Sequence, residues 1–220
     1  MAEQQTSDPV ILEFEAIRAR THCPFAPSAS ITFGPGLDVD RDLARVAEAL
    51  ARYTAALAPG SSSGFVLGVR GACDSVADAG QLLNRLLLGL ARAERQDAGW
   101  CWGPNVESPT WQFEYGGVKM FVNVFGPCYP ASHSKHAEWD EGIIVFFQPE
   151  SSFDDCGVHP GRRDLRRSIR RRFAEAGQPY SGPLIDRRVE ALLYVFPVGL
   201  DDAPVRWWTL DGDSALNLLG

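Results

Sequence analysis

The densest group of reactive side chains lies in one segment, residues 126–140, which reads GPCYPASHSKHAEWD. Two of the chain's four histidines, His133 and His136, stand here close to Cys128 and Lys135. Imidazole and thiolate groups are metal ligands, and the nearby Tyr129 and Trp139 offer aromatic walls for a cofactor. A histidine in a polar loop is, however, more often exposed or hydrogen-bonded than metal-bound. The segment therefore marks a candidate site whose chemistry is open at this point.

A second candidate is a basic segment, residues 161–172, with the sequence GRRDLRRSIRRR. Leu165, Ile169 and Phe173 recur every four residues, which is typical of a helix that docks one apolar face on the core. The arginines then lie on the rest of the helix surface. There they form either a solvated face or binding groups for carboxylates, with which arginine makes bidentate pairs.

Acidic side chains crowd both ends of an apolar run, residues 142–148, with the sequence GIIVFFQ. A buried cation must be paired with an acid or stacked on an aromatic ring, so any of these acids can bind a cationic ligand. Asp154 closes an FQPxxxFD pattern, although an aspartate after a strand is commonly a turn or cap residue. The full set is Glu138, Asp140, Glu141, Glu150, Asp154 and Asp155.

Several other chemistries are excluded because their motifs are absent. The chain contains no ExxH pair for a diiron centre, no CxxCH for covalent heme and no CxxC pair for zinc. It also lacks the GxGxxG and P-loop patterns that bind dinucleotides and nucleotide phosphates. Electrons for any redox reaction therefore have to come from outside the chain.

Composition favours one globular domain over residues 1–220, of which residues 1–10 are expected to be flexible. The net charge of −7 and pI near 5.1 argue against nucleic acid as a partner. Five scattered cysteines do not form a disulfide framework, and no apolar run is long enough for a membrane. The polar N-terminus has no signal-peptide pattern, so we expect a cytoplasmic protein.

Two amphipathic helices are predicted before the reactive segment. Apolar residues spaced by three and four predict a helix over 40–57, ended by Pro59 and Gly60. A broad leucine-rich face predicts a core helix over 75–93, with Ser75 or Asp74 as its N-cap.

The remaining periodicity indicates strands. We expect strands at 65–69, 142–148 and 190–198, the second of them central and buried on both faces. Residues 110–125 predict two antiparallel strands joined at Gly116–Gly117, where glycine tolerates positive φ. The predicted fold class is α+β, a single domain with a central, mainly antiparallel sheet and helices packed on it.

The stretch WQFEYGGVKMFVNVFGPCYPASHSKHAEWDEGIIVFFQPESSFD, followed by the arginine-rich helix, resembles the YqcI/YcgG family. In that family a strand pair, a Tyr-Pro and His-Ser-Arg-like loop, an FQPxxxFD strand exit and an arginine helix follow in this order. Residues 22–26 (HCPFA) are similar to the family's N-terminal CPFA element. The resemblance spans roughly residues 12–180.

The resemblance implies heme chemistry, because characterised relatives are heme-dependent enzymes that hydroxylate guanidino nitrogens of arginine or related compounds. It places the axial ligand of a heme b iron at His133, with His136 as the alternative. Lys135 stands where relatives have an arginine, and it joins Arg167 and Arg170 as candidates for the propionates. His22 and Cys23 belong to a separate element, which can face the opposite side of the cofactor.

For the substrate, the resemblance implies a small cationic molecule, for which Asp140, Glu150 and Asp154 are the candidate binding acids. Dioxygen or peroxide and an external electron donor complete the expected partners, and a homodimer is compatible with the sequence. The alternative function is a protein that binds or senses heme or another small molecule without turnover.

Overall fold

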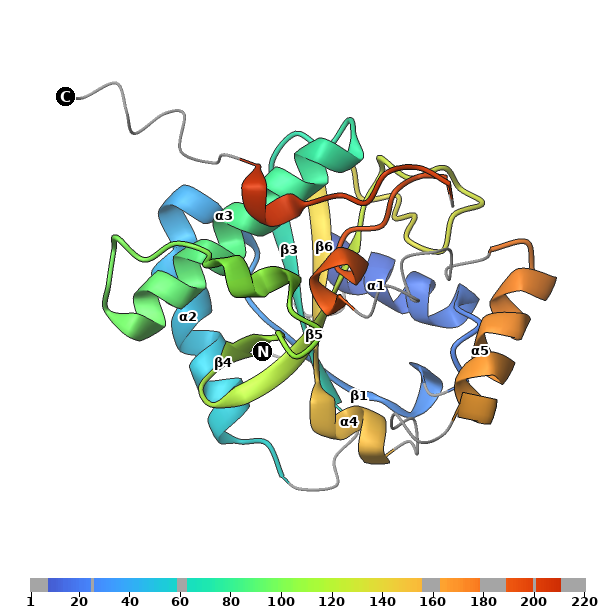
Figure 1. The fold of residues 1–220 in the computed structure, drawn as a ribbon, viewed down its shortest axis with the longest axis horizontal. Coiled ribbons are helices and arrows are strands. Elements are labelled where there is room, and N and C mark those ends of the chain that lie inside the picture. The colour runs from blue at the N-terminus through green and yellow to red at the C-terminus, as the bar shows by residue number, and fades with distance from the viewer. Residues whose placement is uncertain are drawn as a thin grey trace.

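The computed structural model describes residues 8–24, 26–58, 63–155, 163–178, 189–199 and 201–210, without the side chains of 154, 155, 163 and 166. These residues form three layers, with one mixed sheet between two groups of helices (Figure 1). The α+β class with a mainly antiparallel sheet is therefore confirmed. Among the described helices, none has the length and apolar character needed to cross a membrane.

The sheet has the order β1-β3-β6-β5-β4, and β2 pairs with the far end of β3. β1 and β2 run parallel to β3, whereas β3, β6, β5 and β4 alternate in direction. β6 has strands on both sides and is almost entirely buried, as its apolar sequence predicts. The bounds are β1 Ser30–Phe33, β2 Leu37–Asp38, β3 Ser63–Arg70, β4 Phe113–Tyr115, β5 Val118–Phe125 and β6 Gly142–Pro149.

Helices α2 (Val39–Ala55) and α3 (Val76–Arg95) cover one face of the sheet, where the larger core lies. Ser75 caps α3, and its hydroxyl accepts from the Asp78 amide while the Asp78 carboxylate accepts from the Ser75 amide. Both helices were predicted from periodicity. The predicted ending at Pro59 and Gly60 lies outside the described residues, and α2 ends at Ala55.

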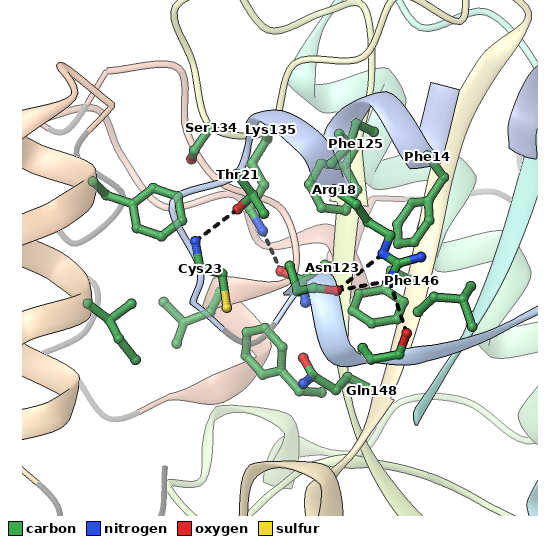
Figure 2. A pocket seen from close by; sticks show the side chains of 18 of the residues that line it. Phe14, Arg18, Thr21, Cys23, Asn123, Phe125, Ser134, Lys135, Phe146 and Gln148 are labelled. Carbon is green, nitrogen blue, oxygen red and sulfur yellow. Dashed lines mark hydrogen bonds between the residues drawn. The ribbon is translucent and has the colours of Figure 1, made fainter. Parts of the chain in front are cut away.

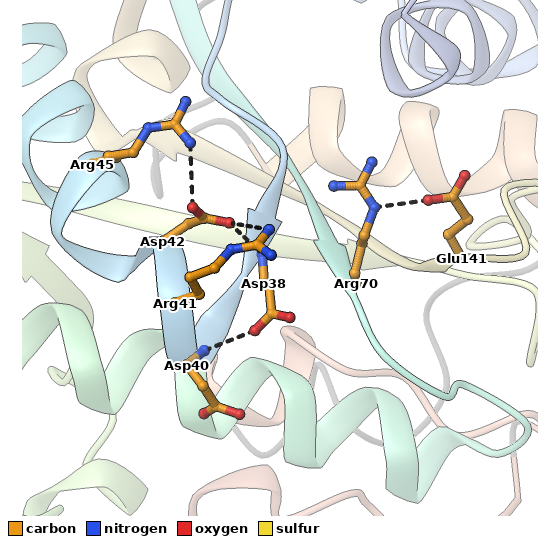
Figure 3. Close-up of polar contacts among 7 residues, drawn as sticks. All are labelled: Asp38, Asp40, Arg41, Asp42, Arg45, Arg70 and Glu141. Atoms are coloured by element: carbon orange, nitrogen blue, oxygen red, sulfur yellow. Dashed lines mark hydrogen bonds and ion pairs between the residues drawn. The ribbon is translucent and has the colours of Figure 1, made fainter.

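Carboxylates anchor the start of α2 on the sheet (Figure 3). Asp42 is buried and accepts from the backbone amide of Asp38 at 3.2 Å and from the guanidinium groups of Arg41 and Arg45. These bonds, that of Arg41 first, lower the pKa of Asp42. Asp38 in turn caps the helix through the Asp40 amide. The polar cluster is thus explained by its structural role.

The opposite face carries α1 (Pro9–Arg20) and α5 (Arg163–Glu175), at the right of Figure 1. Phe14 and Ile17 of α1 pack on a second apolar cluster, and α5 turns Ile169 and Phe173 inward as predicted. Helix α1 was not predicted. It begins at Pro9, and residues 1–7, which belong to the segment expected to be flexible, lie outside the described part.

The predicted hairpin is present, with β4 and β5 joined by Gly116 and Gly117 at φ values of 60° and 72°. The short remaining helices are α4 (Glu150–Asp155), η2 (Ala26–Ser28), η3 (Pro104–Glu107), η5 (Glu190–Leu193) and η6 (Trp207–Thr209).

The predicted strand at 190–198 is wrong, because this segment is the 3-10 helix η5 followed by a turn. Its apolar residues are buried against an aromatic cluster rather than in a strand ladder. The Tyr194 ring stacks on Trp207 at 5.8 Å, and its hydroxyl donates to the carbonyl oxygen of Met120. An apolar run indicates burial, and here burial comes without strand geometry.

Candidate functional site

A cavity of about 240 Å³ lies between α1, α5 and the sheet face formed by β5 and β6 (Figure 2). It exists because β5 and β6 turn alternate side chains toward this face, while α1 and α5 stand on either side. Its walls are mostly apolar and aromatic, contributed by Phe14, Ile17, Ile31, Phe121, Phe125, Phe146, Phe153, Ile169, Phe173, Leu193 and Phe196. Such walls favour an apolar or flat ligand.

The amine of Lys135 is fully buried in this cavity. It donates a hydrogen bond to Oδ1 of Asn123 and lies 4.9 Å from the ring centroids of both Phe125 and Phe196. Burial lowers the pKa of Lys135 from 10.5 to about 7, an effect that the charge of Cys23 partly opposes. A lysine with this pKa exists in both protonation states near neutrality, which is typical of functional sites.

Two more polar groups of the wall are Ser134 and Cys23. The buried Ser134 Oγ has no hydrogen-bond partner among the described residues. Cys23 carries a thiol rather than a disulfide, and its amide donates to Thr21 Oγ1 at 3.3 Å. The cavity therefore combines apolar walls with a thiol, an amine and a hydroxyl.

Arg18 holds one rim of the cavity in place. Its guanidinium donates to the carbonyl oxygens of Ala26 at 3.0 Å and Ala29 at 3.0 Å, and it pairs with Glu15 at 2.7 Å. These bonds tie α1 to the segment that leads into β1. Arg18 thus positions the turn that carries Cys23.

His133, the predicted iron ligand, is not among the described residues that line the cavity. Its ring stacks on Tyr129 at 4.5 Å and 9°, and its Nδ1 accepts from the Lys135 amide at 3.1 Å. Burial and then the charge of Lys135 lower the pKa of His133 to about 4, whereas a hydrogen bond with the Pro197 backbone opposes this. The imidazole is thus neutral near pH 7, and its ring is already in contact with Tyr129 and with the backbone of Lys135 and Pro197.

His136 and His22 are likewise not among the described residues that line this cavity. The His136 ring shares a hydrogen bond of 2.7 Å with the carbonyl oxygen of Tyr129, and the His22 ring meets the edge of Phe173 at 5.6 Å. His159 lies outside the described residues. No group of three or more metal-ligating side chains occurs in the described part of the chain.

The predicted charged groups are spread over the surface. Arg167 is exposed and Arg170 is half-buried on α5, and neither is among the described lining residues. Asp140 and Glu150 are both exposed and flank β6 at opposite ends, so the structure does not bring them together. Asp154 lies on α4, and its side chain is outside the description.

Cys128, a candidate thiolate ligand by type, pairs with a second thiol instead. It forms a side-chain hydrogen bond with Cys73, and this bond and burial both raise the pKa of Cys128. The same bond lowers the pKa of Cys73, although burial opposes the change. Cys73 is buried in the main core. The pair lies among core residues and is not part of the cavity wall.

The sequence interpretation named Cys23 as part of the CPFA-like element but missed Asn123 and Arg18 as groups around the cavity. Asn123 had a signal, because it is a polar residue at an inward position of a mostly apolar strand. Arg18 had none, because α1 itself was not predicted.

Comparison with known proteins gives one match. No curated protein and no solved structure matches the chain significantly. The family model of the YqcI/YcgG family matches residues 26–186, which is more than half of the chain. The matched region contains all described strands, α5 and Lys135, and it begins three residues after Cys23. The chain belongs to the YqcI/YcgG family.

Proposed function

We propose that this protein is a heme-dependent monooxygenase that hydroxylates a guanidino nitrogen of arginine or of a related small cationic substrate. The proposal is supported by family membership, by the resemblance to heme-dependent relatives and by one structural observation. That observation is the aromatic cavity that also holds the thiol of Cys23 and the amine of Lys135.

The residues of the cavity fit a heme b by type. Phenylalanine rings suit the apolar faces of a porphyrin, a thiolate or imidazole is a standard axial ligand, and cations suit the propionates. When bound, heme supplies the activation of dioxygen or peroxide, with electrons from an external donor. Cys23 would hold the iron, Lys135 would face a propionate, and the aromatic walls would keep water out.

Cys23 is the favoured axial ligand because it lines the cavity, whereas the described wall contains no histidine. His133 remains the second candidate. To coordinate iron, its ring would have to leave the stack on Tyr129 or turn away from the backbone groups of Lys135 and Pro197. Those contacts make His133 a better support for the Lys135 segment than a ligand.

The cavity is smaller than the pockets of drug-sized ligands, which begin at about 300 Å³. Heme binding therefore requires a wider cavity than the one in this structure. Helix α5 closes one side of the present cavity through Ile169 and Phe173.

The substrate's guanidinium requires an acid or an aromatic face near the iron. The described wall holds aromatic rings and no acid. Asp154 is the favoured acid among those predicted, because it directly follows Phe153, which lines the cavity. Asp140 and Glu150 are exposed at the two ends of β6 and are weaker candidates.

The test is expression with a heme precursor, followed by a Soret spectrum and a pyridine hemochromogen assay. We expect coloured protein in which Cys23→Ser loses heme or its native spectrum, while the exposed Cys101→Ser control retains both. If His133→Ala alone loses heme, the ligand is His133. Colourless protein that ignores added hemin would falsify the cofactor assignment, and hydroxylated product from arginine with an oxidant or reductant tests turnover.

A second function, small-molecule binding without turnover, is favoured by the size of the cavity. As it stands, the volume of about 240 Å³ suits a small ligand rather than a porphyrin. Ligand binding with no hemin uptake and no product would select this alternative.

A further inference from the structure

The amine of Lys135 is a cationic group that the cavity surrounds with apolar side chains. Lys135 is buried, and a lysine ammonium has three donors, yet among the described residues its amine donates one hydrogen bond, to Asn123. The described wall contains no aspartate or glutamate, and Cys23 is its one group that can become negative. The amine therefore has no carboxylate partner among the described lining residues. This is unusual, because buried charges are normally paired.

A second polar group beside it is also unsatisfied. Ser134 Oγ is the single buried side-chain oxygen or nitrogen without a hydrogen-bond partner in the described part of the chain. Leaving a buried donor unpaired is costly, so such groups in native structures call for an explanation. Ser134 precedes Lys135, both line the cavity, and they lie on the same side of it in Figure 2.

We propose that Lys135 and Ser134 form a carboxylate-binding site, and that its ligand is a small apolar acid. One carboxylate has two oxygens and about four acceptor positions, so it can accept from the amine and the hydroxyl together. The apolar tail would lie against the phenylalanine rings, and the cavity volume of about 240 Å³ limits its size. An apolar amine would face an unpaired like charge, and an alcohol would leave the cation without a counter-ion.

The inference concerns the cavity assigned to heme above but does not require the cofactor. A carboxylate can come from a free acid or from a heme propionate, and both present the same group to Lys135. The free acid is favoured, because the cavity volume of about 240 Å³ suits a small ligand better than a porphyrin.

The experiment is calorimetric titration of heme-free protein with hexanoate, hexan-1-ol and hexylamine. We expect binding of hexanoate alone. Lys135→Met should weaken it at least about tenfold and Ser134→Ala several-fold. Lys119→Met is the matched control, because it removes the same charge from an exposed position of β5.

A parallel titration with hemin and hemin dimethyl ester separates the two sources. Equal binding of hemin and its ester, with hexanoate binding intact, supports a free acid. Binding of hemin but not its ester, lost in Lys135→Met, supports the same site with a propionate as its ligand. The inference is overturned if well-folded Lys135→Met binds both hexanoate and hemin as tightly as the wild type does. It is also overturned if the alcohol or the amine binds as tightly as hexanoate. Hemin that fails to bind while hexanoate binds overturns only the proposed cofactor.

Discussion

Replacing Lys135 by methionine should stabilise the protein, and the gain should depend on pH. Methionine has a similar length and no charge, so it fills the space between Phe125 and Phe196 without a desolvation cost. The folded protein disfavours the charged lysine, since burial lowers the pKa from 10.5 to about 7.

The magnitude follows from this pKa difference. At 1.36 kcal/mol for each pKa unit, the folded state loses about 5 kcal/mol when Lys135 must be charged. Between pH 7 and 10.5 the unfolded chain binds more protons than the folded one, so stability rises with pH in that window. From pH 6 to pH 9 the wild type should gain about 3 kcal/mol from this group alone. Loss of the bond to Asn123 costs the variant about 1–3 kcal/mol.

The assay is urea unfolding of both proteins at pH 6, 7, 8 and 9. We expect Lys135→Met to be about 2–4 kcal/mol more stable at pH 6, with most of that difference gone at pH 9. A constant difference across this pH range, or a less stable variant at pH 6, would refute the argument that Lys135 is held in a desolvated cavity.

Three further measurements test the local structure. In the urea unfolding assay, Gly116→Ala should destabilise the protein by about 2–3 kcal/mol, because the φ of Gly116 is positive and the new Cβ would meet Thr54. Gly117→Ala should cost only about 1 kcal/mol, because its φ is also positive but the space around it is open. Ser75→Ala should remove the cap of α3 and cost about 1 kcal/mol by thermal or urea unfolding. In an NMR titration the His133 imidazole should stay neutral down to about pH 5 and protonate near pH 4, whereas an ordinary midpoint near 6.5 would contradict its burial.

The fold was predictable where a residue pattern has one structural meaning. Periodic leucines over 75–93 indicate a helix, and paired glycines within a segment rich in aromatic and β-branched residues indicate a hairpin. Helix α1 was missed because apolar residues such as the exposed Leu12 lie on its outer face as well as on its inward face, so its amphipathic pattern is weak. The 190–198 segment was misassigned because continuous apolar character reports burial, which η5 and its turn achieve by packing on Trp207.

The candidate site was predictable only in part, since it is assembled from segments far apart in the chain. Lys135 was named from the reactive loop, and the structure places it in the cavity. Cys23 comes from the turn after α1, more than a hundred residues earlier, and meets the same cavity only because α1 packs on β5 and β6. Which loop residues face inward also depends on the stack between Tyr129 and His133, which no local pattern specifies.

The position of Lys135 and Ser134 argues for a binding role independently of which ligand is correct. The rest of the described core obeys the rule that buried polar side chains find partners, as Asn84 does with Trp102 and with the Leu210 carbonyl. The two under-satisfied groups are consecutive residues, and both face the one aromatic cavity. A cost of several kcal/mol concentrated at a single wall is expected where a ligand supplies the missing partners, because binding then recovers the free energy that folding leaves unused.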